Sequence, residues 1–286
     1  MTLSITGRCS RTGQMGVAMS SFDCNFGPAT YSIAQAGIGA VAAQAMTPEG
    51  VSQEVLAYLW DGLPAATALA EALDEEDEIA RERAQLGVVD AAGRAAAFTG
   101  ERTMEWRGHR TGEGWAAAGN TLAGEHVVVA VGETFEAGAE LPLDERLLSA
   151  LEAGIAAGGD RRGHRGAYLR VTTGEPTSEV GIRVHEHAHP TAELRRLLAV
   201  HRQQSDFFAT GLEANAAIRA VLSEADFAPF AELATYAAIE RIRALLAVRA
   251  ADDDTLAKVD RLLAALPCRP DMAEQRFGDL LKVLPL

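Results

Sequence analysis

Thr2 is the residue whose chemistry most distinguishes this sequence. It follows Met1 directly and opens a stretch that predicts two short strands, Thr2 to Arg8 and Met15 to Ser20, joined by a tight turn. If Met1 is removed, a hydroxyl and an α-amine stand on one residue, so a nucleophile and its general base need no separate histidine. An unperturbed α-amine titrates near ~7.7 to 8.0, so part of it can accept the hydroxyl proton at neutral pH. The alternative is that Thr2 is only a β-branched residue at the start of an edge strand.

A second set of chemically capable residues is the run His185-Glu186-His187-Ala188-His189, which matches the zinc pattern H-E-x-x-H. On a helix, two of these histidines would share one face with the glutamate as base. However, Pro190 disfavours helical backbone at His189, and the run follows the strand-like GIRV. Extended chain would place the three histidines on one side, where they could still hold a metal. We assign no metal and leave this alternative open.

Two further motifs have simpler explanations. Gly37 to Ala42 fits the dinucleotide pattern G-x-G-x-x-A, but no long amphipathic helix follows it, so closely packed small residues in a buried strand explain it better. Cys24 is an alternative nucleophile without an identifiable histidine partner. We therefore expect no cofactor.

The loop Gly158 to Gly166 concentrates charge and glycine. Loops at the ends of rigid elements often carry substrate contacts, and a guanidinium can clamp a carboxylate with two hydrogen bonds. We predict that Arg161 and Asp160 contact substrate. The alternative is solvated loop charge, with Asp160 paired to a neighbour.

Composition limits the partners of this 286-residue chain. The 26 basic and 40 acidic residues give a net charge of −14, which repels nucleic acid and anionic lipid. Three dispersed cysteines are typical of a reducing compartment, so we predict a cytoplasmic protein. The first residues lack the pattern of a signal peptide, and the weakly polar stretch from Tyr31 to Met46 is too short and polar to span a membrane.

The order of periodic segments predicts an α+β domain over residues 1–204 and an all-α extension over residues 205–286. In the first domain strands, helices, strands and helices follow in turn, with Thr47-Pro48 as a predicted helix start and the residues around His109 as a glycine-rich loop. In the extension, Ser205, Asp252 and Asp271 are predicted caps, and three prolines divide about four helices; these prolines are Pro229, Pro267 and Pro270.

Several long phrases resemble the domain-of-unknown-function 1028 family. They are GVVDAAGRAAAFTG from Gly87, HRTGEGWAAAGNTLAG from His109 and AAGGDRRG from Ala156. The resemblance extends over most of Thr2 to Leu198 and implies the fold of the N-terminal nucleophile hydrolases, a four-layer αββα sandwich. The segment SFDCNFGP from Ser21 is more polar than is usual in the family, which implies a different substrate pocket.

The resemblance also implies roles for individual residues. Thr2 matches the family's opening threonine, and Asn120 matches an asparagine in its GN-x-LAG phrase. An oxyanion needs fixed donors, which the amide of Asn120 could supply, although asparagine at a strand end is also a common turn residue. Gln44 and His109 lie in resembling phrases and are predicted substrate contacts.

These observations predict an amide-bond hydrolase that acts on a small nitrogenous metabolite or short peptide through Thr2. The alternative is a catalytically silent small-molecule-binding protein on the same fold, because a shared fold does not secure shared chemistry. We also expect a homodimer, since alanine-leucine helices of the extension can pair across a two-fold axis.

Overall fold

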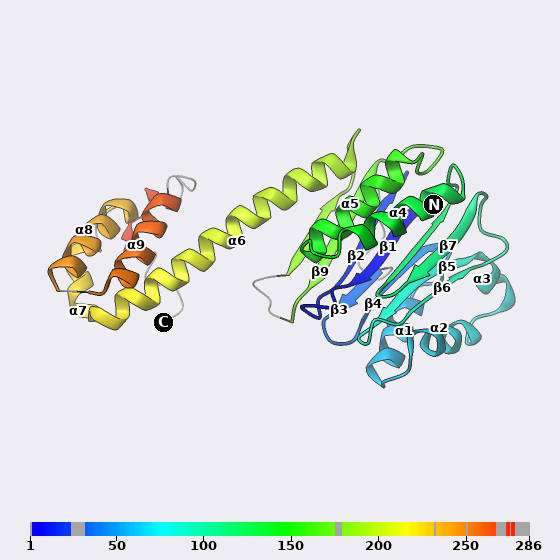
Figure 1. Ribbon diagram of the computed structural model, residues 1–286, viewed down its shortest axis with the longest axis horizontal. Coiled ribbons are helices and arrows are strands. Elements are labelled where there is room, and N and C mark those ends of the chain that lie inside the picture. The colour runs from blue at the N-terminus through cyan, green and yellow to red at the C-terminus, as the bar shows by residue number, and fades with distance from the viewer. Residues whose placement is uncertain are drawn as a thin grey trace. The chain divides into compact units, whose positions relative to one another are not determined.

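Strand β1, Thr2–Arg8, lies in the interior of a six-stranded antiparallel sheet in the computed structural model (Figure 1). The structure describes residues 2–23, 32–174, 179–231, 233–249, 251–266, 273–274 and 276–277. The six-stranded sheet has the order β10-β9-β2-β1-β8-β7, and a four-stranded sheet has the order β3-β4-β5-β6. The other strands are β2 Met15–Ser21, β3 Ser32–Gln35, β4 Gly39–Ala45, β5 Ala84–Asp90, β6 Ala95–Thr99, β7 Arg107–Gly112, β8 Trp115–Asn120, β9 Gly166–Thr172 and β10 Val180–Val184.

The two sheets face each other, and helices cover their outer faces. Helices α4 and α5 contact the six-stranded sheet, whereas α1 and α2 contact the four-stranded sheet (Figure 1). The helices are α1 Val51–Trp60, α2 Ala65–Asp74, α3 Glu78–Arg83, α4 Glu125–Ala137, α5 Leu143–Ala156, α6 Pro190–Val221, α7 Glu224–Phe227, the 3₁₀ helix η2 Ala228–Phe230, α8 Thr235–Val248 and α9 Asp253–Ala265. The predicted α+β class with a helical C-terminal stretch is confirmed.

Alternation along β1 decides which side chains face the space between the sheets. Leu3 and Ile5 pack under the helices, so Thr2, Ser4 and Thr6 point toward the four-stranded sheet. The buried hydroxyls of Ser4 and Thr6 donate to the carbonyl oxygens of β8 at 3.4 and 3.2 Å. Polar side chains are therefore accommodated between the sheets by bonding to the backbone.

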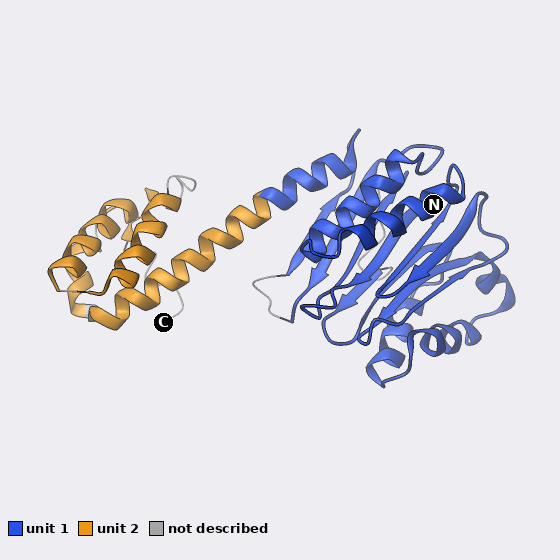
Figure 2. Cartoon of the chain, in the orientation of Figure 1, with its two compact units in different colours: residues 1–199 blue, residues 200–286 orange. Residues whose placement is uncertain are grey.

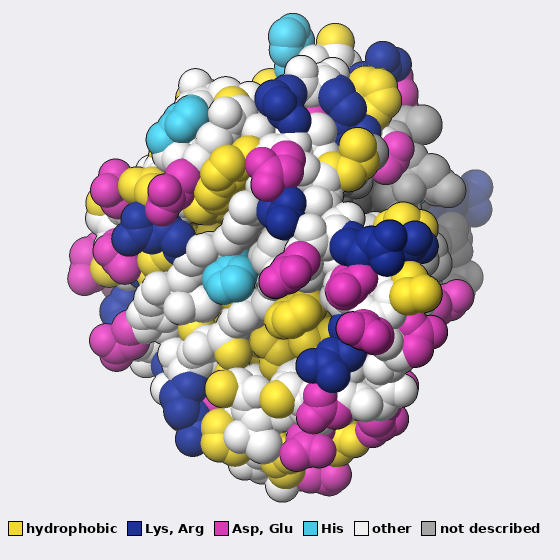
Figure 3. Space-filling view, turned by 90° about the vertical axis from the view of Figure 1, so that its right-hand side faces the viewer, with side chains coloured by type: hydrophobic (Ala, Val, Ile, Leu, Met, Phe, Trp, Pro, Cys, Tyr) yellow, Lys and Arg dark blue, Asp and Glu magenta, His cyan; other side chains and the backbone are white. Residues whose placement is uncertain are grey.

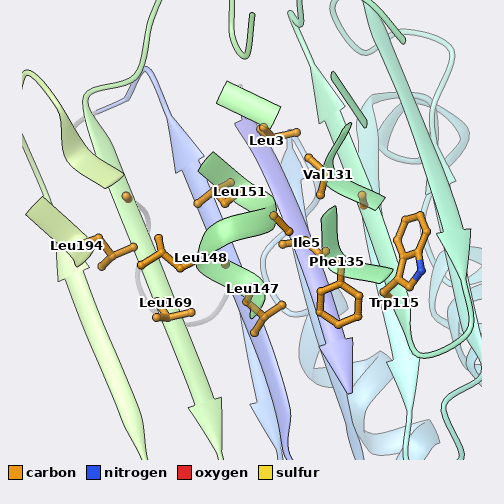
Figure 4. Packing of buried hydrophobic residues seen from close by; sticks show 14 of the residues in the cluster. Leu3, Ile5, Trp115, Val131, Phe135, Leu147, Leu148, Leu151, Leu169 and Leu194 are labelled. Carbon is orange, nitrogen blue, oxygen red and sulfur yellow. The ribbon is translucent and has the colours of Figure 1, made fainter. Parts of the chain in front are cut away.

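The largest hydrophobic core lies between the six-stranded sheet and its helices (Figure 4). Aliphatic side chains from α5 interlock with those of the strands, while Phe135 of α4 and Trp115 of β8 close one side. The labelled members are Leu3, Ile5, Trp115, Val131, Phe135, Leu147, Leu148, Leu151, Leu169 and Leu194. This packing holds β1 and β8 in place. β1 begins at Thr2 and β8 ends at Asn120, the two residues predicted to be catalytic.

Two local predictions in the N-terminal unit were wrong. The segment around His109 is not a loop but strand β7, because it pairs with β8 across a turn at Gly114. Thr47 does not cap α1, whose N-cap is Gly50. Its hydroxyl instead donates to Gln44 O at 2.6 Å and accepts from Gln85 N at 3.1 Å, which ties the end of β4 to β5.

The contacts divide the chain into residues 1–199 and 200–286 (Figure 2). The division falls inside α6, which runs without interruption through residues 204 and 205, the predicted start of the extension. Ser205 therefore lies within a helix and caps nothing, because the periodic pattern runs through it. Asp252 is confirmed as a cap, since its carboxylate accepts from Thr255 N at 2.8 Å. Asp271 and two of the predicted breaks, Pro267 and Pro270, lie outside the described residues.

The C-terminal unit has a hydrophobic core of its own, formed by α6, α8 and α9. Its fully or nearly buried members are Phe207, Ala214, Ile218, Leu222, Phe227, Ala238, Ile239, Ile242, Leu246, Val259, Leu262, Leu266 and Phe277. None of the helices in the described ranges combines the length and the apolar character that crossing a bilayer requires.

Acidic and basic side chains are interspersed on the face that Figure 3 shows. The net charge of −14 thus does not gather into a single acidic patch on this face.

The close contact between β2 and α5 generates a stability prediction at Gly16. A Cβ there would stand 2.6 Å from Leu147 Cδ1 and 2.8 Å from the carbonyl oxygen of Arg170. We expect Gly16→Ala to lower the free energy of unfolding by about 1 to 3 kcal/mol, because backbone cannot yield as a side chain can. Gly181→Ala in β10 is the matched control, since nothing lies within 4 Å of its Cβ. Urea denaturation measures both, and equal effects of the two substitutions would contradict this account.

Candidate functional site

Four polar residues face one another at one end of the space between the sheets. On the six-stranded sheet, Leu3 pairs with Gly119, so Thr2 and Asn120 come next to each other on β1 and β8. On the four-stranded sheet, Gln44 of β4 pairs directly with Gln85 of β5. All four are buried, with Asn120 and Gln85 fully so. The structure therefore brings together three residues predicted from the sequence and a fourth, Gln85, that was not predicted.

Gln85 holds this cluster together. Its Nε2 donates to the carbonyl oxygen of Gly119 at 2.8 Å and lies 3.2 Å from that of Gly108, both on the opposite sheet. Only the amide nitrogen can donate to a carbonyl, so these contacts fix the orientation of the side chain. Its Oε1 is thereby turned to accept hydrogen bonds from Asn120 Nδ2 at 2.7 Å and Gln44 Nε2 at 2.8 Å.

The orientation of Gln85 determines which atoms of its neighbours remain unused. Because Gln44 and Asn120 must each present nitrogen to Gln85, their oxygens point elsewhere. Gln44 Oε1 and Asn120 Oδ1 are buried and have no hydrogen-bond partner among the described residues. Thr121 Oγ1 is also buried without a hydrogen-bond partner among the described residues. The backbone of Thr121 is left-handed, with a φ of 60°. A buried polar atom left unpaired costs about 1 to 3 kcal/mol, so a hydrogen-bond donor placed beside any of these oxygens would be stabilising.

Thr2 lies at the edge of this cluster and is sheltered from solvent, with 6% of its surface exposed. Gln44 Nε2 approaches its carbonyl oxygen at 3.4 Å. Met1 lies outside the described residues, and its removal stays a prediction. The position of Thr2 meets one requirement of the predicted chemistry, because a nucleophile exposed to bulk water would gain little from fixed dipoles.

The loop with Asp160 and Arg161 lies beside the strand end that carries Asn120. Leu122 pairs with Asp160, and Arg161 N donates to Thr121 O at 3.0 Å. The buried carboxylate of Asp160 binds the guanidinium of Arg162, with Nη2 to Oδ2 at 2.6 Å and Nε to Oδ1 at 3.0 Å. Pairing of Asp160 with a neighbour was the sequence-based alternative to a substrate contact. The observed pair with Arg162 engages both carboxylate oxygens. The guanidinium of Arg161 donates to Glu105 O, and its contact with substrate stays a prediction.

His109 connects to the cluster through Thr99. Its Nδ1 lies 2.9 Å from Thr99 Oγ1, which also accepts from Gln85 Nε2 at 3.0 Å. Hydrogen bonds therefore run from β7 through β6 to Gln85. His109 does not touch Thr2 directly in this arrangement, and its role as a substrate contact stays a prediction.

His164 is a second residue that was not predicted from the sequence. Ser20 Oγ donates to Gly166 O at 2.9 Å, so His164 Nδ1 donates to Ser20 Oγ at 2.8 Å. Asp160 N donates to His164 Nε2 at 3.0 Å, and the ring is therefore neutral. Burial lowers the pKa of His164, which agrees with a neutral ring. The histidine holds the loop against β2 rather than acting as a base.

None of the remaining sequence motifs contributes a hydrogen bond to the cluster within the described residues. His185, His187 and His189 are exposed on a non-helical segment, and no group of three metal-ligating side chains occurs within the described ranges. His187 Nδ1 accepts from His189 N at 2.9 Å. Cys24, the alternative nucleophile, lies outside the described residues. The last four residues of the run Gly37 to Ala42 open β4, whose first six residues are buried, as the packed-strand interpretation predicted.

Two hollows open elsewhere on the N-terminal unit. One of about 590 Å³ is lined by Glu78, Arg81, Glu82, Phe98, Thr99, Gly100 and Glu101. One of about 340 Å³ is lined by Ile33, Ala34, Gln35, Ala36, Arg170, Thr172, Gly174 and Glu179. The second is far from Thr2 along the strands, because Thr172 pairs with Met15 whereas Thr2 pairs with Ser21. Neither hollow is lined by the four clustered residues.

The neutral ring of His164 generates a pH prediction. A histidine whose pKa is lower in the folded state stabilises the fold above the unfolded pKa of about 6.5, and this stability is lost as the pH falls below that value. We expect the stability difference between the wild type and His164→Gln to shrink below pH 6.5, by at most about 1.4 kcal/mol per pH unit. Urea denaturation at several pH values measures it. His126→Gln, on an exposed ring of α4, is the control, and a difference that is constant with pH would contradict the assignment.

Comparison with known proteins gives a family but no activity. No curated protein matches the chain. Among solved structures, the crystal structure of protein SPO2555 from Silicibacter pomeroyi, labelled with the same family model, is similar with a TM-score of 0.62 and 29% sequence identity. The similarity covers 69% of this chain and 84% of that one. The family model itself matches residues 2–194, so the chain belongs to the family of unknown function DUF1028.

Proposed function

We propose that the protein is an N-terminal nucleophile amidohydrolase in which Thr2 attacks a carbonyl carbon of a small nitrogenous substrate. The observation that carries the proposal is the buried cluster of Thr2, Asn120, Gln44 and Gln85 between the two sheets. In the N-terminal unit two sheets lie face to face, and helices cover the outer face of each. This order of layers supports placing the unit among αββα sandwiches of the N-terminal nucleophile type.

The proposed reaction begins with removal of Met1. The free α-amine of Thr2 takes the proton of the hydroxyl as Oγ bonds to the carbonyl carbon. The tetrahedral oxyanion collapses with cleavage of the C–N bond, and the leaving nitrogen takes the proton from the α-amine. Water then attacks the ester, releases the acid and restores the hydroxyl of Thr2.

Asn120 is the proposed oxyanion donor. One of the two hydrogens on its Nδ2 bonds to Gln85 Oε1, which leaves the second for the substrate oxygen. Because Gln85 is itself fixed by two backbone carbonyls, the donor is preorganised before substrate arrives. A donor of this kind contributes roughly 3 kcal/mol to transition-state stabilisation.

The chemistry of Thr2 can be tested by covalent labelling. We expect purified protein to lack the mass of Met1 and to be acylated on Thr2 by an activated ester. Thr2→Ala should lose the label while Thr2→Ser keeps it, because serine retains the hydroxyl. Intact-mass and peptide mass spectrometry measure both events, with circular dichroism as the folding control. Retention of Met1, or a label on another residue, would leave the binding-protein alternative as the better account.

We also propose that the chain pairs with a second copy through the C-terminal unit. Phe208 and Leu212 stand one helical turn apart on α6 and are 53% and 43% exposed. Apolar side chains spaced in this way form a stripe that a symmetric helix contact would bury. The continuous helix makes truncation near residue 204 a poor test, since the cut would fall within α6.

Paired substitution on this stripe is the better experiment. We expect the double variant Phe208→Glu with Leu212→Glu to halve the mass found by light scattering while leaving the helix content unchanged, because charge cannot be buried in an apolar contact. Trp60→Glu, at an exposed position of the N-terminal unit, is the control. A wild-type mass equal to one chain would end the proposal.

A further inference from the structure

We propose that the unpartnered oxygens of Gln44 and Asn120 bind a neutral terminal –NH₂ group of the substrate, which makes the substrate a primary carboxamide or a ureido compound. This inference rests on the proposed function and names the substrate class for the same site. It starts from two buried atoms, Gln44 Oε1 and Asn120 Oδ1, that have no hydrogen-bond partner among the described residues.

The orientation of the Gln85 side chain determines whether the open positions of the site accept or donate hydrogen bonds. Its Nε2 is committed to backbone carbonyls of the six-stranded sheet, so its Oε1 must face both neighbouring amides. Rotating either neighbour by half a turn would set oxygen against oxygen. The open positions on Gln44 and Asn120 are thus acceptors, and the group that fills them must donate hydrogen bonds.

The number of acceptors limits the kind of donor. Both amides bond to the same Oε1 of Gln85, so they are close neighbours. One internal peptide N–H has a single hydrogen and could satisfy only one of the two oxygens. A terminal –NH₂ has two hydrogens, one for each of the two oxygens, so neither Gln44 Oε1 nor Asn120 Oδ1 would stay unpaired.

The charge of the donor follows from its surroundings. The side chains joined to Gln85 are those of Gln44, Asn120 and Thr99, and all of them are neutral. The carboxylate of Asp160 on the adjoining loop is paired with Arg162. Burying an ammonium ion without a counter-charge costs several kcal/mol, which exceeds the gain of about 1 kcal/mol from each hydrogen bond. A neutral –NH₂ avoids this cost.

The identity of the donor sets the products. With a primary carboxamide, the bond that breaks is the one between the carbonyl carbon and the –NH₂ nitrogen. The nitrogen leaves with the proton held by the α-amine as ammonia, and water completes the conversion to the carboxylic acid. A ureido substrate would give a carbamic acid in the same way.

Binding by the wild-type protein tests the inference without any substitution. The probes are butyramide, pentan-2-one, N-methylbutyramide and butylammonium. Pentan-2-one has nearly the shape of butyramide but carries a methyl group in place of –NH₂. We expect butyramide to bind about tenfold or more tightly than pentan-2-one, from two hydrogen bonds, with the other two probes weaker than butyramide. Titrations followed by NMR of the side-chain amides of ¹⁵N-labelled protein give the Kd values.

Equal affinity for butyramide and pentan-2-one would overturn the inference. The oxygens would then be satisfied by water or by the α-amine of Thr2 itself. Tighter binding of butylammonium would overturn the choice of a neutral group.

A matched pair of variants assigns the effect to Gln44. Gln44→Met should reduce the preference for butyramide over pentan-2-one at least threefold, because it removes one of the two acceptors. Gln35→Met, at an exposed position of the neighbouring strand β3, should leave the preference unchanged. If Gln44→Met does not fold, the affinities of the four probes for the wild-type protein still decide whether the site prefers a neutral –NH₂ group.

Measuring ammonia release separately distinguishes this inference from the proposed function. A preference for –NH₂ in Thr2→Ala, together with no ammonia from butyramide or butylurea in the wild type, would keep the recognition site and reject the hydrolase. Labelling of Thr2 without any preference for –NH₂ would keep the hydrolase and reject the recognition site.

Discussion

The hydrogen bonds of the Gln85 side chain are the interaction on which the site depends. They join the four-stranded sheet, which carries Gln85, to the backbone of β7 and β8 in the other sheet. They also orient Asn120 and Gln44, and Gln44 reaches the main chain of Thr2. One buried side chain therefore joins the two sheets at this end and sets the direction of each amide. A hydrophobic residue at this position could fill the space, but it could not give the neighbouring amides a direction.

The coarse fold could be predicted from the sequence because its signals are local. Period-two alternation in β1 and β2, turn glycines, and apolar spacing in α1, α4 and α5 each depend only on neighbours in the chain. The errors arose where a local signal was outweighed by a distant contact. Thr47 has the type of an N-cap residue, yet its hydroxyl bonds to Gln44 and Gln85. The glycines around His109 are typical of a loop, yet pairing with β8 makes the segment a strand.

The candidate site could be predicted only in part for the same reason. Thr2 was singled out by its position after Met1, and Asn120 and Gln44 by the family resemblance; the structure places the three together. Gln85 is the second residue of β5, before an apolar run from Leu86 to Val89, and a polar residue there is typical of a solvated strand end. Its one signal is that it lies in register with Gln44, and register depends on strand pairing that the sequence does not specify. His164 could not be predicted for the same reason, because its partner on β2, Ser20, lies 144 residues away in the chain.

The uncharged character of the cluster has a consequence for the proposed chemistry. Carboxamides and hydroxyls do not titrate in the physiological range, and His109 is separated from Gln85 by Thr99. The loop next to the site contributes a paired carboxylate and a histidine held neutral. Under the proposed mechanism, the α-amine of Thr2 is then the group whose ionisation governs the nucleophile, since it must be neutral to accept the hydroxyl proton. A site that recognises a neutral –NH₂ through fixed amides and activates its own hydroxyl through its own amine needs no charged side chain at the reacting centre.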